Sequence, residues 1–173
     1  MIKKIDKPNV PITFLCRYET DMIYDVLVHQ TDGFSFQLKP KKLDRPIQKQ
    51  FEATLFEAYL EKPEVFGYFQ HEKVIGYIEG SIQTWNLVYR VTNFWVDETK
   101  RRQKIGSKLL KHLIMHAKEL RLRAVVLETQ SCNSPAIELY LRCGFTFIGL
   151  DTLCYTNEDI KRGEVRLEMG LKL

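Results

Sequence analysis

Apolar and polar residues in the first part of the chain follow patterns that predict strands and one helix. Residues 11–18 are mainly apolar, residues 22–29 alternate weakly, and the Thr31-Asp32-Gly33 turn predicts a hairpin into residues 34–38. Pro40 and Pro46 are expected to break the chain. From residue 47 to residue 61, apolar positions recur at helical spacing, so we predict a helix that Pro63 ends.

The middle of the chain predicts a strand meander followed by a crossover. Residues 65–70, 74–84 and 87–96 are rich in β-branched and aromatic residues. Residues 105–119 carry one apolar face at helical spacing, and residues 124–130 begin with the continuous apolar run of a buried parallel strand. The last three segments therefore predict a right-handed βαβ unit.

The remaining part of the chain completes the sheet. Ser134-Pro135 predicts the start of a second helix, and Cys143-Gly144 predicts its end. Residues 145–149 and 164–173 are expected to be strands, and in the second of them apolar residues alternate with Glu164, Arg166 and Glu168. The fold class is therefore α/β, with a mixed central sheet of about six to seven strands flanked by helices.

Length and composition narrow the class of protein. The chain has 173 residues, of which 45% are hydrophobic and 28% charged, as expected of one globular domain. No apolar run has the length of a signal peptide or a membrane helix, so we expect a cytoplasmic protein with no membrane partner. The four cysteines lack the spacing of a disulfide framework or a metal site, so we expect reduced thiols and no metal.

Positive charge is concentrated in one segment. Residues 100–111 contain six basic residues and no acidic one, although the net charge of the chain is only +4. The segment lies between a predicted strand and the start of a predicted helix, where backbone N–H groups and the helix dipole can bind an anion. It lacks the G-x-x-x-x-G-K-[ST] and G-x-G-x-x-G loops, and the chain has no G-x-S-x-G elbow, which argues against ATPase, dehydrogenase and serine-hydrolase activity.

Two blocks of sequence resemble the GNAT superfamily of acyl-CoA-dependent N-acyltransferases. Residues 101–106 are similar to its pyrophosphate loop, Q/R-x-x-G-x-G/A, with Lys104 where the first Gly usually stands. Residues 127–145 resemble its L-E-x-x-x-x-N-x-x-A-x-x-x-Y-x-x-x-G-F stretch. The sequences of residues 127–130 and 149–155 look most like those of streptothricin acetyltransferases. The Glu/Asn/Tyr spacing is equally like that of ribosomal-protein alanine N-acetyltransferases.

The resemblance implies that acetyl-CoA is the co-substrate and lies between strands 87–96 and 124–130, which part to receive it. It also implies three parts within a single domain: residues 1–64 on the acceptor side, residues 65–155 as the acetyl-CoA-binding core, and residues 156–173 as the C-terminal strand. The cofactor-binding residues that it implies are Phe94, Trp95, Val96, Arg101, Arg102, Gln103, Lys104, Ile105, Gly106, Ser107, Asn133 and Tyr140. Among these, the backbone N–H of Val96 is the expected oxyanion donor.

Amide formation from a thioester also needs an acid and a base. Tyr140 matches the general-acid position of the family, and a phenol can protonate a departing thiolate at a cost of about 2 kcal/mol. Glu128 matches the position of the base in alanine N-acetyltransferases, but an ordinary carboxylate is about 3.5 pKa units too weak to deprotonate an α-ammonium. Burial of the carboxylate, a relay water or Glu79 are the alternatives, and each residue could instead have only a packing or hydrogen-bonding role.

The leading hypothesis is an acetyl-CoA-dependent N-acetyltransferase that acts by direct attack of a primary amine, with a small cationic acceptor such as streptothricin. One alternative is an alanine-type peptide N-terminal acetyltransferase, and another is a catalytically silent CoA-sensing or nucleic-acid-binding module. No nucleic-acid partner is expected, and the assembly is a monomer or a homodimer. His112 and His116 are interpreted as a surface pair, and an acidic face on helix 47–61 is expected near the acceptor; it comprises Glu52, Glu57, Glu61 and the following Glu64.

Overall fold

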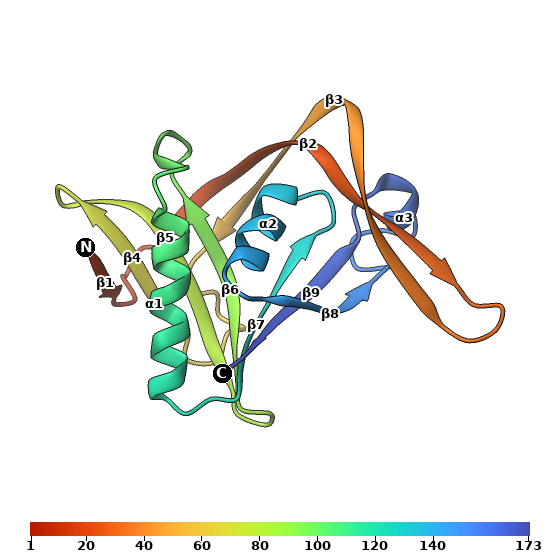
Figure 1. Cartoon of the computed structure of the whole chain (residues 1–173). Coiled ribbons are helices and arrows are strands. Elements are labelled where there is room, and N and C mark those ends of the chain that lie inside the picture. Colours follow the sequence, from red (N-terminus) through yellow and green to blue (C-terminus); the bar gives the residue numbers. More distant parts are fainter. The chain divides into compact units, whose positions relative to one another are not determined.

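The computed structural model describes all 173 residues and confirms the α/β class (Figure 1). Its elements are β1 (Ile2–Ile5), β2 (Thr13–His29), β3 (Ser35–Thr54), β4 (Glu64–Gln70), β5 (Lys73–Gln83), β6 (Val88–Val96), a 3₁₀ turn (Glu98–Lys100), α1 (Ile105–Glu119), β7 (Ala124–Gln130), α2 (Ser134–Arg142), β8 (Thr146–Asp151), α3 (Asp159–Arg162) and β9 (Arg166–Lys172). Seven strands form one sheet in the order β1-β4-β5-β6-β7-β9-β8, while β2 and β3 form a separate two-stranded sheet. The sheet is mixed, since β1, β4, β5 and β6 pair antiparallel and β6 pairs parallel with β7.

The chain divides into two compact units. The first comprises residues 1–17, 50–127 and 170–173, and in it α1 packs along β4, β5 and β6 (Figure 1). The predicted helix 105–119 is confirmed, and its apolar face is fully buried at Leu109, Leu110, Leu113 and Ala117. This core forms because the apolar stripe of one helix covers the apolar side of an antiparallel sheet.

The second unit comprises residues 18–49 and 128–169. Its main helix, α2, begins and ends where the sequence predicted. The Asn133 side chain caps the first turn of α2 by accepting from the Ala136 N–H, and a proline stands in that turn. Gly144 follows the helix with a φ of +90°, a left-handed conformation that favours glycine. Ile137, Tyr140 and Phe145 are buried core residues of this unit.

The predicted helix over residues 47–61 is wrong. Residues up to Thr54 extend β3, and residues 55–63 form turns. The helical stripe does not make one buried face, because Phe51 and Tyr59 are 48% and 75% exposed while Leu55 is 2% exposed. Pairing with the distant strand β2 decides the conformation, and such long-range pairing is invisible to local periodicity.

The two prolines of this region do not break the chain. Pro40 and Pro46 both lie within β3, and both are exposed. A two-stranded sheet leaves one edge of each strand unpaired, and proline is tolerated there because its missing N–H removes no ladder bond.

Two short elements were not predicted, β1 and α3. Only four residues long, β1 forms because it pairs with β4, from Ile2 opposite Tyr68 to Ile5 opposite Val65. Asp159 begins α3, and its carboxylate accepts from the backbone N–H groups of Tyr155 and Thr156. None of the helices has the length and apolar character required to cross a membrane.

Candidate active site

The end of β6 presents peptide groups at the edge that faces away from β5. The Asp97 N–H donates to the Ile75 carbonyl at 3.0 Å, and Val96 lies opposite Gly76 in the antiparallel ladder. Because peptide direction alternates along a strand, the N–H and C=O groups of Phe94 and Val96 face the other edge. The parallel ladder with β7 covers only residues 88–90 of β6, so it does not reach these groups.

The basic segment forms a tight loop at the start of α1. Asp97 begins it by accepting from the Thr99 N–H at 2.9 Å and the Thr99 hydroxyl at 2.7 Å. Arg102 and Lys104 both have a φ of +62°, and α1 starts directly after Lys104. The first helical bond is donated by Lys108 to the Lys104 carbonyl, so the preceding N–H groups at residues 105–107 are unused by the helix. This arrangement is suited to an anion.

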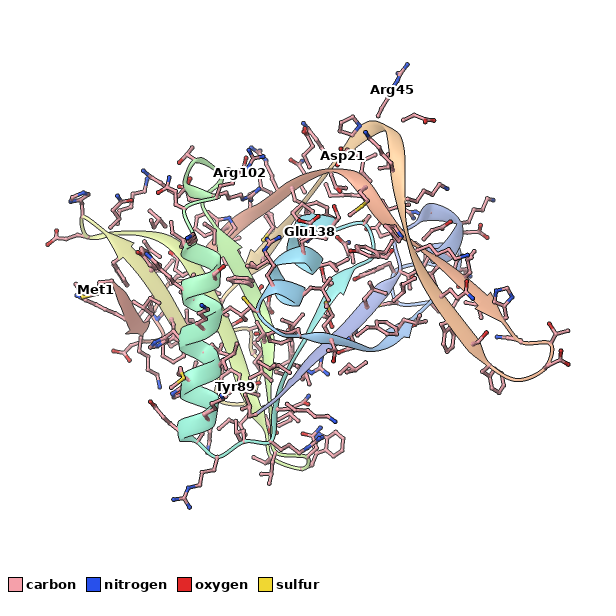
Figure 2. All side chains as sticks on the ribbon, in the orientation of Figure 1. Met1, Asp21, Arg45, Tyr89, Arg102 and Glu138 are labelled. Carbon is pink, nitrogen blue, oxygen red and sulfur yellow. The ribbon has the colours of Figure 1, made fainter.

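Lys104 occupies the position at which the family pattern has glycine, and the structure shows how it fits. Its backbone is left-handed, which costs a residue with a Cβ about 1 kcal/mol relative to glycine. The side chain is exposed, as are those of Arg101, Arg102 and Gln103, and Arg102 projects from the loop in Figure 2. The lysine therefore keeps the loop conformation and adds a positive charge.

The guanidinium of Arg101 is already hydrogen-bonded to backbone carbonyls of the protein. It donates to the Val96 carbonyl at 3.3 Å and to the Arg17 carbonyl at 2.6 Å. These bonds join the loop to the end of β6 and to β2. The phosphate-binding role of Arg101 stays a prediction, and the structure gives it a positioning role in the loop.

The face of the sheet opposite α1 carries an aromatic cluster made of Phe14, Tyr77 and Trp95. Their ring centroids lie 5.5–5.6 Å apart, and the Trp95 indole N–H donates to the Leu15 carbonyl at 3.2 Å. The neighbouring Gly76 faces α1, since a Cβ there would lie 3.0 Å from Leu109 Cδ1. Side chains alternate along a strand, so Tyr77 must face the other way. Trp95 thus packs its side chain in this cluster while its neighbours present their peptide groups at the edge.

Glu79, an alternative base from the sequence, lies on the same face and is fully buried. Its carboxylate accepts from the Phe56 N–H at 2.6 Å, the Thr92 hydroxyl at 3.0 Å and the Asn93 amide at 2.6 Å. All three donors are neutral groups of the first unit. A carboxylate with this environment is fixed in place and shielded from water.

Glu128, the other candidate base, has a different environment in the second unit. Its side chain is 42% exposed and forms an ion pair of 2.5 Å with Arg166. Arg166 also bonds to Glu168 at 2.6 Å. Burial alone would lower the pKa of the Arg166 guanidinium, but the bonds to Cys154 and Glu168 and the charge of Glu128 outweigh burial and raise this pKa. Burial, followed by the charge of Glu128, raises the pKa of the nearby Tyr155. Glu128 is therefore accessible and oriented by a fixed cation.

Tyr140 lies on α2 of the second unit, and Asn133 directly precedes this helix. Tyr140 is 6% exposed, and its ring centroid lies 6.0 Å from that of Phe145. The Asn133 side-chain oxygen accepts from the Ala136 N–H at 3.3 Å, which is a capping role. Their predicted roles as general acid and as cofactor ligand stay predictions.

A hydrogen-bonded chain in the second unit was not predicted as part of the site. The Tyr18 hydroxyl donates to Gln130 at 2.6 Å, the Gln130 amide donates to Glu164 at 2.7 Å, and Lys49 pairs with Glu164 at 2.6 Å. The charged residues that alternate along the last strand were its only sequence signal, because Tyr18 and Lys49 come from β2 and β3, far away in the chain.

The acidic face expected on helix 47–61 does not exist. Glu52 lies on β3, Glu57 and Glu61 lie in the turns, and Glu64 begins β4. Glu64 bonds to Lys4 at 2.6 Å and to His116 at 2.8 Å instead of facing a cationic ligand. The acids are therefore dispersed because the helix that would have aligned them is absent.

The interpretation of His112 and His116 as a surface pair is also wrong. Both are half-buried, and both rings pack edge-on against Phe66, at centroid distances of 4.8 Å and 5.2 Å. Burial lowers the pKa of His112, with a smaller contribution from His116. These histidines therefore help α1 to pack on β4.

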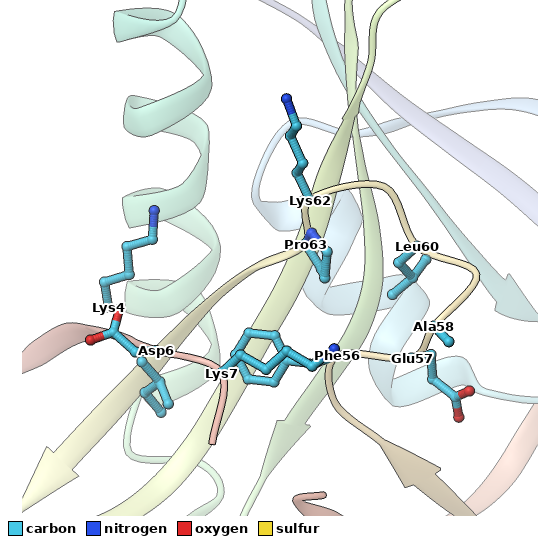
Figure 3. Close-up of a pocket in the computed structure, with 10 residues that line it drawn as sticks. Lys4, Asp6, Lys7, Phe56, Glu57, Ala58, Leu60, Lys62 and Pro63 are labelled. Carbon is cyan, nitrogen blue, oxygen red and sulfur yellow. The ribbon is translucent and has the colours of Figure 1, made fainter. Parts of the chain in front are cut away.

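A pocket of about 290 Å³ lies beside the 55–63 turns (Figure 3). Lys4, Lys7 and Lys62 contribute positive charge to its lining, and Phe56 and Glu57 line it from the turn. It contains none of the predicted site residues. Those residues instead form two groups: 94–96 with 101–107 in the first unit, and Glu128, Asn133 and Tyr140 in the second.

Comparison with known proteins identifies the family. The model of the acetyltransferase (GNAT) family matches residues 23–145. This chain belongs to that family. The match includes β6, the basic loop, α1, β7 and α2, and so contains both groups of predicted site residues.

The individual relatives include two kinds of acetyltransferase. A streptothricin acetyltransferase from Escherichia coli is 33% identical over 90 residues, which are 52% of this chain and 51% of the relative. The N-alpha-acetyltransferase 30 of Dictyostelium discoideum is 45% identical over 78 residues, 44% of this chain and 42% of the relative. The alignments thus span about half the length of these relatives or less. The crystal structure of a nourseothricin acetyltransferase has a TM-score of 0.75 at 26% identity, covering 94% of this chain and 98% of that one.

Proposed function

We propose that this protein is an acetyl-CoA-dependent N-acetyltransferase that transfers the acetyl group to a primary amine by direct attack. The observation that carries the proposal is the combination, in the first unit, of outward-facing peptide groups at the end of β6 with an anion-binding loop at the start of α1. The family match of the chain supports the same reaction.

In this proposal, acetyl-CoA binds to the first unit mainly through backbone groups. The N–H groups at residues 105–107 bind the pyrophosphate, and Arg102 and Lys104 add long-range attraction. The peptide groups of Phe94 and Val96 pair with the pantetheine as another strand would. The Val96 N–H then stabilises the oxyanion of the tetrahedral intermediate.

Two side chains are proposed for the proton chemistry. Tyr140 donates a proton to the departing thiolate of CoA, and Glu128 accepts the proton of the attacking amine, directly or through a water. The ion pair with Arg166 fixes the direction of the Glu128 carboxylate. The amine nitrogen forms the new C–N bond to give the tetrahedral intermediate, and the C–S bond breaks when this intermediate collapses, so no other nucleophile is needed.

A cysteine nucleophile fits the first unit poorly, which favours direct attack. Cys16 lies on β2, where Arg101 contributes a lowering charge, but burial dominates and raises the pKa of its thiol to about 11. Such a thiol is almost fully protonated near neutral pH and is a weak nucleophile. A covalent acetyl-cysteine intermediate at this position is therefore not part of the proposal.

For the acceptor, we propose a small cationic amine such as streptothricin. The relatives support this choice, because the E. coli relative is a streptothricin acetyltransferase and the nourseothricin enzyme shares the fold over nearly the whole chain. A peptide α-amine is the second candidate, favoured by the 45% identity to N-alpha-acetyltransferase 30 over 78 residues. A silent module that senses CoA or binds nucleic acid is the alternative of another class.

A panel assay of CoA release from acetyl-CoA tests the proposal. The acceptors are streptothricin, an aminoglycoside, a polyamine and short peptides that begin with Ala or Ser. We expect saturable turnover on streptothricin at micromolar concentrations. Turnover only on the peptides would contradict the small-molecule acceptor and support the second candidate.

Acetyl-CoA binding separates the enzyme from a module that only binds nucleic acid, whereas turnover in the panel assay separates it from a silent CoA sensor. A ligand present at 100 times its Kd stabilises a protein by about 2.7 kcal/mol, which a thermal-shift titration detects. We expect such a shift with acetyl-CoA and none with DNA or RNA. A shift with nucleic acid alone would contradict the enzymatic proposal.

A further inference from the structure

Glu79 is a buried carboxylate with an unusual set of partners. The residue has no exposed surface, and its two oxygens accept from one backbone N–H and two neutral side chains, at Phe56, Thr92 and Asn93. A buried carboxylate is costly unless its oxygens are hydrogen-bonded. All three groups donate, so each would lose its partner if the carboxylate were replaced by a donor.

Two of these donors lie at a bulge in β6. Glu79 is paired with Asn93, but the next residue, Gly80, is paired with Val91, so Thr92 is an extra residue on β6. The strands approach closely here, because a Cβ on Gly80 would lie 2.5 Å from the Arg90 carbonyl oxygen. Glu79 Oε2 accepts from both Thr92 and Asn93 and so fixes the bulge from the partner strand.

The bulge decides which way the end of β6 faces. Before it, Tyr89 packs its ring near His116 of α1, at a centroid distance of 6.0 Å. After it, Trp95 packs on Tyr77, on the opposite face of the sheet. An extra residue shifts the alternation of a strand by one position, so the bulge also sets the direction of the peptide groups of Phe94 and Val96.

The third donor belongs to a strained turn that follows β3 in the first unit. Phe56 has a φ of +61°, which is unfavourable for a residue with a large side chain. Its N–H is bound by Glu79, and the carbonyl of the nearby Thr54 accepts from the same Asn93 amide at 3.2 Å. Phe56 also lines the pocket in Figure 3.

We propose that Glu79 is a positioning residue for acetyl transfer: it joins the Phe56 turn to the β6 bulge and so fixes the peptide groups of Phe94 and Val96 for acetyl-CoA. This inference rests on the proposed function, in which those groups bind the pantetheine and the oxyanion. Glu79 is not the base, since its oxygens are already occupied by three donors and it has no access to solvent.

The substitution Glu79→Gln tests this role with little change in size. The amide of glutamine has one acceptor and one donor end, so at least one of the three present donors meets another donor. We expect acetyl-CoA to bind at least about 10-fold more weakly in isothermal titration calorimetry. In turnover on any amine that the wild type accepts, we expect kcat/KM to fall about 100-fold, as for a displaced reactive geometry, with the acid limb of its pH profile unchanged.

Glu64→Gln is the matched control. Glu64 lies opposite Gly80, the residue that follows Glu79 on β5. Its carboxylate bonds to Lys4 and to His116 of α1, and it accepts from the Tyr89 hydroxyl at 3.3 Å. This control loses comparable hydrogen bonds in the same sheet and should keep the wild-type Kd for acetyl-CoA. An equal weakening in both variants would reduce Glu79 to a general stabilising residue and overturn the proposal.

A gentler pair keeps the test valid if Glu79→Gln fails to fold. Thr92→Val removes one donor from the carboxylate and Thr92→Ser keeps it, so we expect weaker acetyl-CoA binding in the first variant and recovery in the second. An unchanged Kd in Thr92→Val would overturn the positioning role by itself. If Glu79→Gln folds, an unchanged Kd or loss of the acid limb in that variant would also overturn it. Absence of acetyl-CoA binding by the wild type would instead contradict the proposed function.

Discussion

The β5–β6 region and the β7–β9 region each contain a carboxylate that the sequence offered as a candidate base, and they hold it in opposite ways. Glu79 of β5 has no exposed surface and accepts only from neutral donors. Glu128 of β7 is 42% exposed and is paired with the Arg166 cation of β9. A carboxylate closed off by three donors maintains a structure, whereas an exposed one can exchange its partners and meet a substrate amine.

The difference assigns separate tasks to the two regions. In the proposed function, the β5–β6 region supplies the backbone groups that bind acetyl-CoA, so changes in it should weaken acetyl-CoA binding and leave the acid limb of the pH profile unchanged. The β7–β9 region and α2 carry the titratable side chains, so changes there should appear in kcat and in the pH profile.

The largest expected effect is at Tyr140, in the second unit. Tyr140→Phe should lower kcat by about 10²–10⁴-fold, the range for losing one acid–base group, with an unchanged Kd for acetyl-CoA. Steady-state kinetics and calorimetry measure the two quantities. Tyr24→Phe, an equally conservative change in the same unit, is the control, and normal turnover in Tyr140→Phe would reduce Tyr140 to a packing residue.

Glu128→Gln should have the next largest effect and sharpens the comparison with Glu79. We expect a decrease of about 10²-fold in kcat/KM and loss of the acid limb of its pH profile, because the proton acceptor is removed. The pH dependence of kcat/KM is the measurement, with Glu79→Gln as the contrasting variant. If Glu128→Gln keeps the acid limb, another group accepts the proton and the assignment of tasks is wrong.

A smaller effect is expected in the basic loop. The double reversal Arg101→Glu with Lys104→Glu should weaken acetyl-CoA binding about 10-fold or more at low salt, and the effect should shrink near 1 M salt, where the screening length is about 3 Å. Calorimetric titrations at several salt concentrations measure it. Lys41→Glu with Lys42→Glu, on β3, reverses the same charge elsewhere, and equal behaviour of the two doubles would show that the loop does not bind the phosphates.

The smallest effect concerns stability at Glu64, on the α1 side of the sheet. Burial alone would raise its pKa, but hydrogen bonds from Lys4 and His116 outweigh burial and lower the pKa of the carboxyl. A lowered folded-state pKa stabilises the fold above the unfolded value of about 4.3, and this stabilisation is lost as the pH falls through the folded value.

Glu64→Gln should therefore lower the Tm at pH 7 by about 2–4 °C, the shift expected for a loss of 1 kcal/mol in a chain of this size. Melting curves from pH 7 down to pH 3 should show the two proteins converge at the acid end. A difference that persists unchanged at pH 3 would mean that the ion pair with Lys4 and His116 contributes nothing.

Prediction from the sequence was most successful where structure depends on neighbours in the chain. The bounds of α1 and β7, the proline and glycine at the ends of α2, and the strands of the meander all follow local signals. The basic loop was also found, because its charge and its place before a helix are properties of one short segment. The segment 47–61 was misjudged, since its pairing with β2 brings together residues far apart in the chain.

By itself, the sequence determined the order of strands and helices in the core, the basic loop before α1 and the family of the chain, because these depend on periodicity, capping and short motifs. Only the tertiary structure decided that Glu79 is enclosed by Phe56, Thr92 and Asn93 while Glu128 pairs with Arg166. Two identical carboxylates differ only in the partners and solvent around them, and those are brought by strands remote in sequence. The assignment of one as a positioning residue and the other as a candidate base therefore comes from burial and hydrogen bonding.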